Sequence, residues 1–149
     1  MSSGLPDPQV VNLLKASSRL VLAKIWKAGQ AGEELNAEEE RYYRVMLEHE
    51  EYHDLWDSLE YVYDKDIMID GVSPFLHITI HAVIEEQVAK GQPPEVVETL
   101  ERLQRAGLDR HEAIHRIGRV FGRCLWSTLQ AQKPFDATRY VSELRELRP

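Results

Sequence analysis

Residues 73–90 read SPFLHITIHAVIEEQVAK, and they contain the most apolar stretch of the chain. Ser73 is a favourable helix N-cap, and Pro74 stands at the first helical position, where a missing N–H costs nothing. Apolar residues then cover nearly every direction of the helical wheel, which is typical of a helix buried on all sides. The stretch therefore predicts a buried helix that ends near Gly91.

Helical patterns continue on both sides of this stretch. Asn36 with Glu39 three residues later is the capping-box pattern, Gly107 suits a helix C-terminus, and Asp109 suits an N-cap. The expected helices cover residues 9–27, 36–59 with a bend near His49, 74–90, 95–107, 109–130 and a short segment from 136. No run alternates at period two for long enough to form a sheet. We predict an all-α, single-domain bundle of five to six helices over residues 9–149, after a flexible N-terminus of residues 1–8.

Composition excludes several classes of function. The 149 residues carry a net charge of −7, which disfavours a nucleic-acid partner because phosphate binding needs a dense basic patch. The single cysteine, Cys124, fits a reducing cytoplasm and excludes a cysteine-rich zinc site. Residues 1–9 do not resemble a signal peptide, and the most apolar stretch, 75–89, is too short and too polar to span a membrane. We expect a cytoplasmic protein without a nucleic-acid or membrane partner.

All six histidines fall in pairs spaced four residues apart: 49 and 53, 77 and 81, 111 and 115. Residues at this spacing share one face of a helix, and the three pairs lie on three separate predicted helices. Two imidazoles one turn apart can hold one metal ion, and imidazole suits zinc, iron, nickel and copper. The pairs predict a buried metal site with these ligands: His49, His53, His77, His81, His111 and His115.

A carboxylate extends the central pair. His77, His81 and Glu85 form one stripe on the helix that is predicted to be buried. An unpaired buried polar group costs about 1–3 kcal/mol, and a metal would satisfy all three side chains. Together the six histidines and Glu85 would supply enough ligands for one or two ions of iron or zinc.

Two of the pairs also read as H-E-x-x-H: HEEYH at 49–53 and HEAIH at 111–115. This string marks zinc proteases, in which both histidines bind zinc and the glutamate is the general base. Glu50 and Glu112 are therefore candidates for a base or an additional ligand. Both point toward the polar face of their helix, and Glu112 precedes Arg116 by four residues, so a solvated salt bridge is the simpler interpretation.

Other large or reactive side chains are interpreted as core. Trp26, Trp56 and Trp126 lie on predicted helices and are expected to be buried. Cys124 belongs to the apolar face of its helix and is expected to be an inert buried thiol.

Three segments carry a resemblance to a known family: EEYH at 50–53, SPFLHITIHAVIEEQ at 73–87 and DRHEAIH at 109–115. Over residues 36–140 the chain resembles the bacterial DUF1841 family, a domain of unknown function. The resemblance implies a bacterial cytoplasmic protein and brings no activity with it. The family pattern has proline where this chain has Glu50, which weakens the protease interpretation of the first string, whereas the six histidines and Glu85 match.

Three hypotheses follow. The leading one is a metal-binding helical bundle that uses iron or zinc as a small oxidoreductase or as a metal or oxygen sensor. The second is a zinc-dependent hydrolase with Glu50 or Glu112 as the base. The third is a non-catalytic interaction module in which the histidine pairs are structural.

Overall fold

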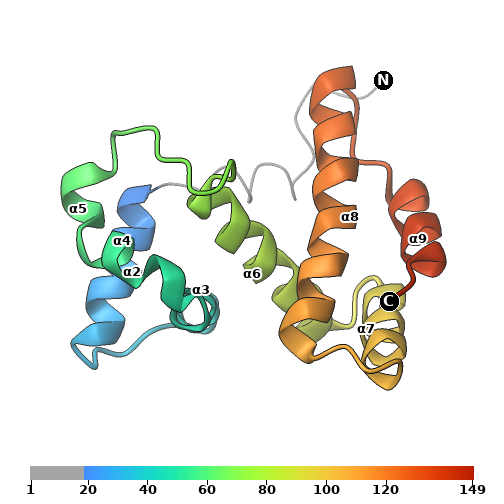
Figure 1. The fold of residues 1–149 in the computed structure, drawn as a ribbon, viewed down its shortest axis with the longest axis horizontal. Helices are drawn as coiled ribbons and strands as arrows, with labels where there is room; N and C mark the ends of the chain where they lie inside the picture. Colours follow the sequence, from blue (N-terminus) through green and yellow to red (C-terminus); the bar gives the residue numbers. More distant parts are fainter. Residues whose placement is uncertain (1–18) are drawn as a thin grey trace. The chain divides into compact units, whose positions relative to one another are not determined.

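A computed structural model describes residues 19–149, and this part of the chain is helical (Figure 1). The expected all-α class is confirmed, with one isolated bridge between Ile69 and Val72 as the only β pairing described. The expected flexible residues 1–8 and the first half of the expected helix over 9–27 lie outside the described residues. The α-helices are α2 (Arg19–Gln30), α3 (Ala37–Glu48), α4 (His53–Asp57), α5 (Leu59–Val62), α6 (Pro74–Lys90), α7 (Pro94–Arg105), α8 (Arg110–Ala131) and α9 (Ala137–Glu146).

The helix starts follow the predicted caps. Asn36 accepts a hydrogen bond from the Glu39 backbone N–H at 2.8 Å, and the Glu39 carboxylate accepts from the Asn36 N–H at 3.0 Å. These reciprocal bonds satisfy two amide groups that the first turn leaves without intrahelical partners. Asp109 caps α8 by accepting from the Glu112 N–H at 2.8 Å, and the Ser73 side chain caps α6.

The expected count of five to six helices is too low, chiefly because the helix expected over 36–59 is broken at His49. Helix α3 ends at Glu48, a 3-10 turn covers Glu50–Tyr52, and α4 begins at His53. The His49 imidazole donates from Nδ1 to the Val45 carbonyl at 2.7 Å, which is the carbonyl that a continuing helix would offer to the His49 backbone N–H. That N–H bonds instead to the Met46 carbonyl at 3.3 Å.

Contacts divide the described chain into two compact units. The N-terminal unit extends to Ala82 and the C-terminal unit covers Val83–Pro149, so α6 contributes its first half to one unit and its second half to the other. The single domain expected over 9–149 stays a prediction. In the N-terminal unit, α2 packs on α3, α4 and α5. Its core consists of Leu22, Ile25, Trp26, Tyr42, Val45, Met46, Tyr52, Trp56, Leu59, Phe75, Ile78 and Ala82.

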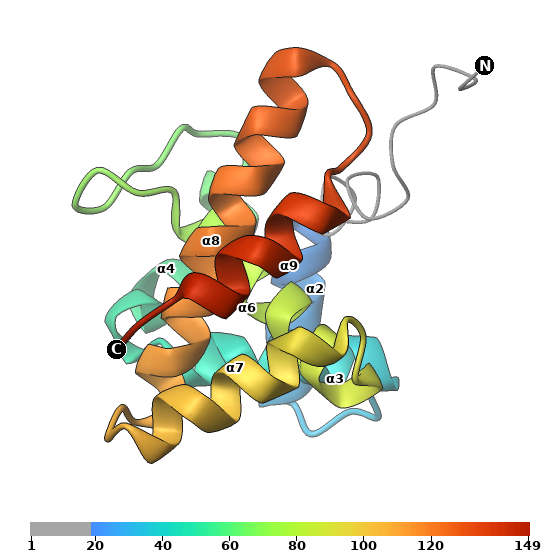
Figure 2. The ribbon, with the colours of Figure 1, turned by 90° about the vertical axis from the view of Figure 1, so that its right-hand side faces the viewer.

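In the C-terminal unit, α7, α8 and α9 pack on one another (Figure 2). Cys124 is buried there as expected. Trp26 and Trp56 are core residues, but the expectation for Trp126 is wrong, because 65% of this residue is exposed. Its position on α8 follows Arg119 and Arg123 on the solvent-facing side of the helix. None of the helices described combines the length and apolar character that a membrane span requires.

Candidate metal centre

His49 is fixed at the break between α3 and the 3-10 turn. The residue is completely buried, and its Nδ1 lies 2.7 Å from the Val45 carbonyl oxygen. A carbonyl oxygen only accepts, so Nδ1 carries the hydrogen, and in the neutral ring Nε2 then bears the lone pair. This is the arrangement that orients metal-binding histidines in proteins, where the second ring nitrogen donates to a backbone carbonyl or a carboxylate.

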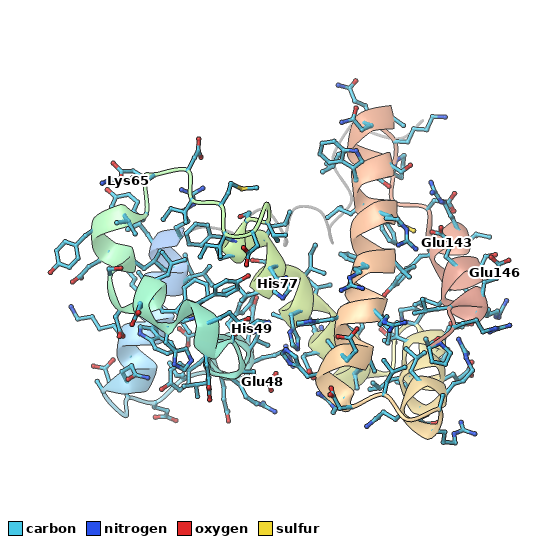
Figure 3. The ribbon with its side chains drawn as sticks, in the orientation of Figure 1. Glu48, His49, Lys65, His77, Glu143 and Glu146 are labelled. Atoms are coloured by element: carbon cyan, nitrogen blue, oxygen red, sulfur yellow. The ribbon has the colours of Figure 1, made fainter. Side chains whose placement is uncertain are left out.

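The Nε2 atom of His49 faces His77. Helix α6 carries His77 so that its Nε2 lies 3.1 Å from Nε2 of His49, and the labelled side chains point toward each other in Figure 3. Two nitrogens at this distance need a shared proton or a shared cation, because two lone pairs would repel. Two imidazoles bound to one zinc ion at about 2.0–2.1 Å lie about 3.4 Å apart in tetrahedral geometry. The observed separation is close to this value.

His81 lies one turn further along α6 and is buried, with 2% of its surface exposed. Its ring centroid is 5.1 Å from that of His49, and ligand nitrogens of the two residues lie within 4.8 Å of each other. Nε2 of His81 also lies 3.6 Å from the Glu48 carboxylate, whose side chain is 37% exposed. Sequence reasoning missed Glu48, which stands directly before the first H-E-x-x-H string.

The Tyr52 ring packs beside the imidazoles of His49 and His77. The ring is parallel to that of His49, with centroids 6.0 Å apart, and edge-on to that of His77 at 6.2 Å. Burial is the main cause that raises the pKa of the Tyr52 phenol, followed by the negative charges of Glu51 and Asp70. The Tyr52 ring restricts the orientation of both imidazoles, since it contacts each of them on one side.

His53, the sequence partner of His49, has different neighbours. The helix break separates the two residues, and the Nε2 atom of His53 donates to the Leu47 carbonyl at 2.9 Å. Its ring lies against Trp26, with centroids 5.2 Å apart. The contacts described for His53 are therefore with Trp26 and Leu47, and the structure does not join this residue to His49 and His77.

The C-terminal unit holds the remaining predicted ligands. Glu85 is mostly buried, with 14% of its side chain exposed, and forms a bidentate pair with Arg110 at 2.6 and 2.9 Å. Such paired hydrogen bonds to a guanidinium are among the strong interactions of a carboxylate. A metal is the partner expected for Glu85 from the sequence, whereas the partner that the structure describes is Arg110.

His111 and His115 lie one turn apart at the start of α8. Their ring centroids are 4.1 Å apart, and they offer ligand nitrogens within 4.8 Å of each other. The second H-E-x-x-H string is thus helical throughout. Glu112 accepts a hydrogen bond from Arg116 at 3.0 Å, as the simpler interpretation expected.

Glu50 differs from Glu112 in its surroundings. It is exposed on the 3-10 turn, outside any α-helix. The first string therefore lacks the continuous helix on which the zinc-protease motif depends. The C-terminal unit offers a helical pair of imidazoles, whereas in the N-terminal unit His77 and His81 each lie beside His49, and Glu48 lies beside His81.

The family model for DUF1841, a domain of unknown function, matches residues 15–146, which is most of the chain. No curated protein and no solved structure matches significantly. The chain therefore belongs to the DUF1841 family.

Proposed function

We propose that the protein binds a transition-metal ion, zinc or iron, through His49, His77 and His81. The observation that carries the proposal is the opposition of two Nε2 atoms, those of His49 and His77, at 3.1 Å. The bond from Nδ1 of His49 to Val45 supports it, because it turns the lone pair of a completely buried imidazole toward His77. Imidazole nitrogen suits both metals.

The chemistry of the C-terminal unit supports a second set of ligands. His111 and His115 offer two imidazoles on one face of α8, and Glu85 offers a carboxylate if its bond to Arg110 is exchanged for a metal. With these residues the chain would hold one or two ions. The ratio of metal to protein in the loaded chain measures this number directly.

We further propose a role in redox chemistry or in metal or oxygen sensing. Three neutral imidazoles around one ion leave coordination positions for a small ligand. The hydrolase alternative has less support, since Glu50 is outside a helix and Glu112 is bound to Arg116. The alternative of a purely structural role has one observation in its favour, because a proton shared by His49 and His77 also accounts for a 3.1 Å separation.

Elemental analysis of protein purified without a histidine tag, then loaded with zinc or with iron(II), tests the proposal. We expect at least one tightly bound ion per chain in the parent. His49→Ala and His81→Ala should lose it. His53→Ala is the matched control and should keep it, because the contacts of His53 are with Trp26 and Leu47. A parent chain that binds neither metal would contradict the proposal and favour structural histidines.

A further inference from the structure

We propose that Glu48 is a carboxylate ligand of the metal site of the N-terminal unit. This inference rests on the proposed function and adds a residue that neither H-E-x-x-H string contains. Glu48 is the last residue of α3 and precedes His49. Its Oε2 atom lies 3.6 Å from Nε2 of the buried His81.

The distance between Glu48 and His81 fits two ligands better than it fits a hydrogen bond. A separation of 3.6 Å is too long for an N–H···O bond. An imidazole nitrogen and a carboxylate oxygen on one zinc ion, each about 2.0–2.2 Å from the metal, lie about 3.3–3.6 Å apart at tetrahedral angles. The two side chains therefore have the spacing that a shared ion would give them.

Electrostatics favours a cation at the same place. The C-terminal end of a helix carries a partial negative charge, and the last turn of α3 contains no basic residue to balance it. Glu48 adds a full negative charge to this end, which makes it a favourable position for a cation. A divalent ion held by His81 and its neighbours would supply that charge.

The position of Glu48 also allows it to adjust. Its side chain is 37% exposed, so a change of rotamer toward the metal displaces no core residue. Glu50 is also an exposed glutamate of the same segment, but it stands on the 3-10 turn beyond His49. It therefore provides a matched control for charge and chemistry.

The test is the metal affinity of the full chain, measured with zinc by competition against a chelator of known affinity. We expect Glu48→Gln to weaken zinc binding by at least about tenfold, since even groups behind the ligands contribute 10- to 100-fold. Glu50→Gln should bind zinc as the parent does. Glu48→His should restore most of the affinity, because it replaces one zinc ligand with another.

The outcomes separate this inference from the proposed function. If the parent binds no zinc or iron, the proposed function fails and this inference fails with it. If the parent binds zinc and Glu48→Gln binds it equally tightly, only the assignment of Glu48 is overturned. Equal losses in Glu48→Gln and Glu50→Gln would also overturn it, because they would show a general effect of charge.

Discussion

Replacing His77 with alanine should remove most of the thermal stabilisation that zinc gives the parent protein. His77 is partly buried on α6. The variant removes the contact of its Nε2 atom with Nε2 of His49 at 3.1 Å. Without metal, losing one such hydrogen bond costs about 1 kcal/mol, which lowers the melting temperature of a chain of this size by about 2–4 °C.

Zinc binding changes the melting temperature more than the loss of this hydrogen bond does. At a free zinc concentration 100-fold above Kd, binding to the folded parent adds about 2.7 kcal/mol and raises its melting temperature by about 5–11 °C. If losing His77 weakens binding 100-fold, the same zinc concentration adds only about 0.4 kcal/mol to the variant. The variant should then melt within about 2 °C of its metal-free form.

Scanning calorimetry of the parent, His77→Ala and His53→Ala, each with excess chelator and with zinc, measures both effects. His53→Ala should keep the zinc-dependent rise in melting temperature, since His53 contacts Trp26 and Leu47. A rise in His77→Ala equal to that of the parent would refute the assignment of His77 as a ligand.

Two predictions concern the C-terminal unit. Burial, followed by the hydrogen bond to Glu143, raises the pKa of the Cys124 thiol to about 12. At pH 8 the folded protein should therefore react with a thiol reagent at least about a thousandfold more slowly than protein unfolded in urea. The folded state favours the neutral thiol, so the stability that Cys124 contributes is present below pH 9 and is lost as pH rises from about 9 toward 12. If Cys124 is the cause, the free energies of unfolding of the parent and of Cys124→Ala, measured by urea titration, should converge across this range. Tyr140→Phe deletes a buried hydrogen bond of 2.7 Å to Gln87 and should lower the free energy of unfolding by about 1–3 kcal/mol, measured by urea titration. The control variant Tyr61→Phe changes a residue that is 75% exposed and should change the free energy of unfolding by less than about 0.5 kcal/mol. Equal effects of the two tyrosine variants would contradict the assignment of that bond.

Local signals in the sequence predicted most of the helix boundaries. The Asn36–Glu39 capping box and the Asp109 cap depend on side chains that bond to nearby backbone groups, so spacing alone reveals them. The break at His49 was only suspected, because it depends on an imidazole that competes for the Val45 carbonyl. Periodicity contains no information about such competition.

For the candidate site too, local spacing was visible in the sequence, whereas contacts between distant residues were not. The four-residue spacing of the histidines predicted that members of different pairs would meet, as His49 and His77 do, but the spacing could not show which members would lie elsewhere. His53 turns to Trp26 because the helix breaks before it, and Glu85 meets Arg110, which is distant in sequence. Both facts depend on tertiary packing.

X-ray absorption spectroscopy at the metal edge of the loaded, untagged protein would identify the ligands of the bound ion. If His49, His77 and His81 bind zinc, the spectrum should show nitrogen scatterers at about 2.0–2.1 Å with the outer-shell pattern of imidazole rings. Three or more imidazoles should fit the parent, and one fewer should fit His77→Ala loaded at a zinc concentration high enough to occupy its weakened site. A first shell of oxygen alone, without imidazole scattering, would contradict the metal site proposed for the N-terminal unit.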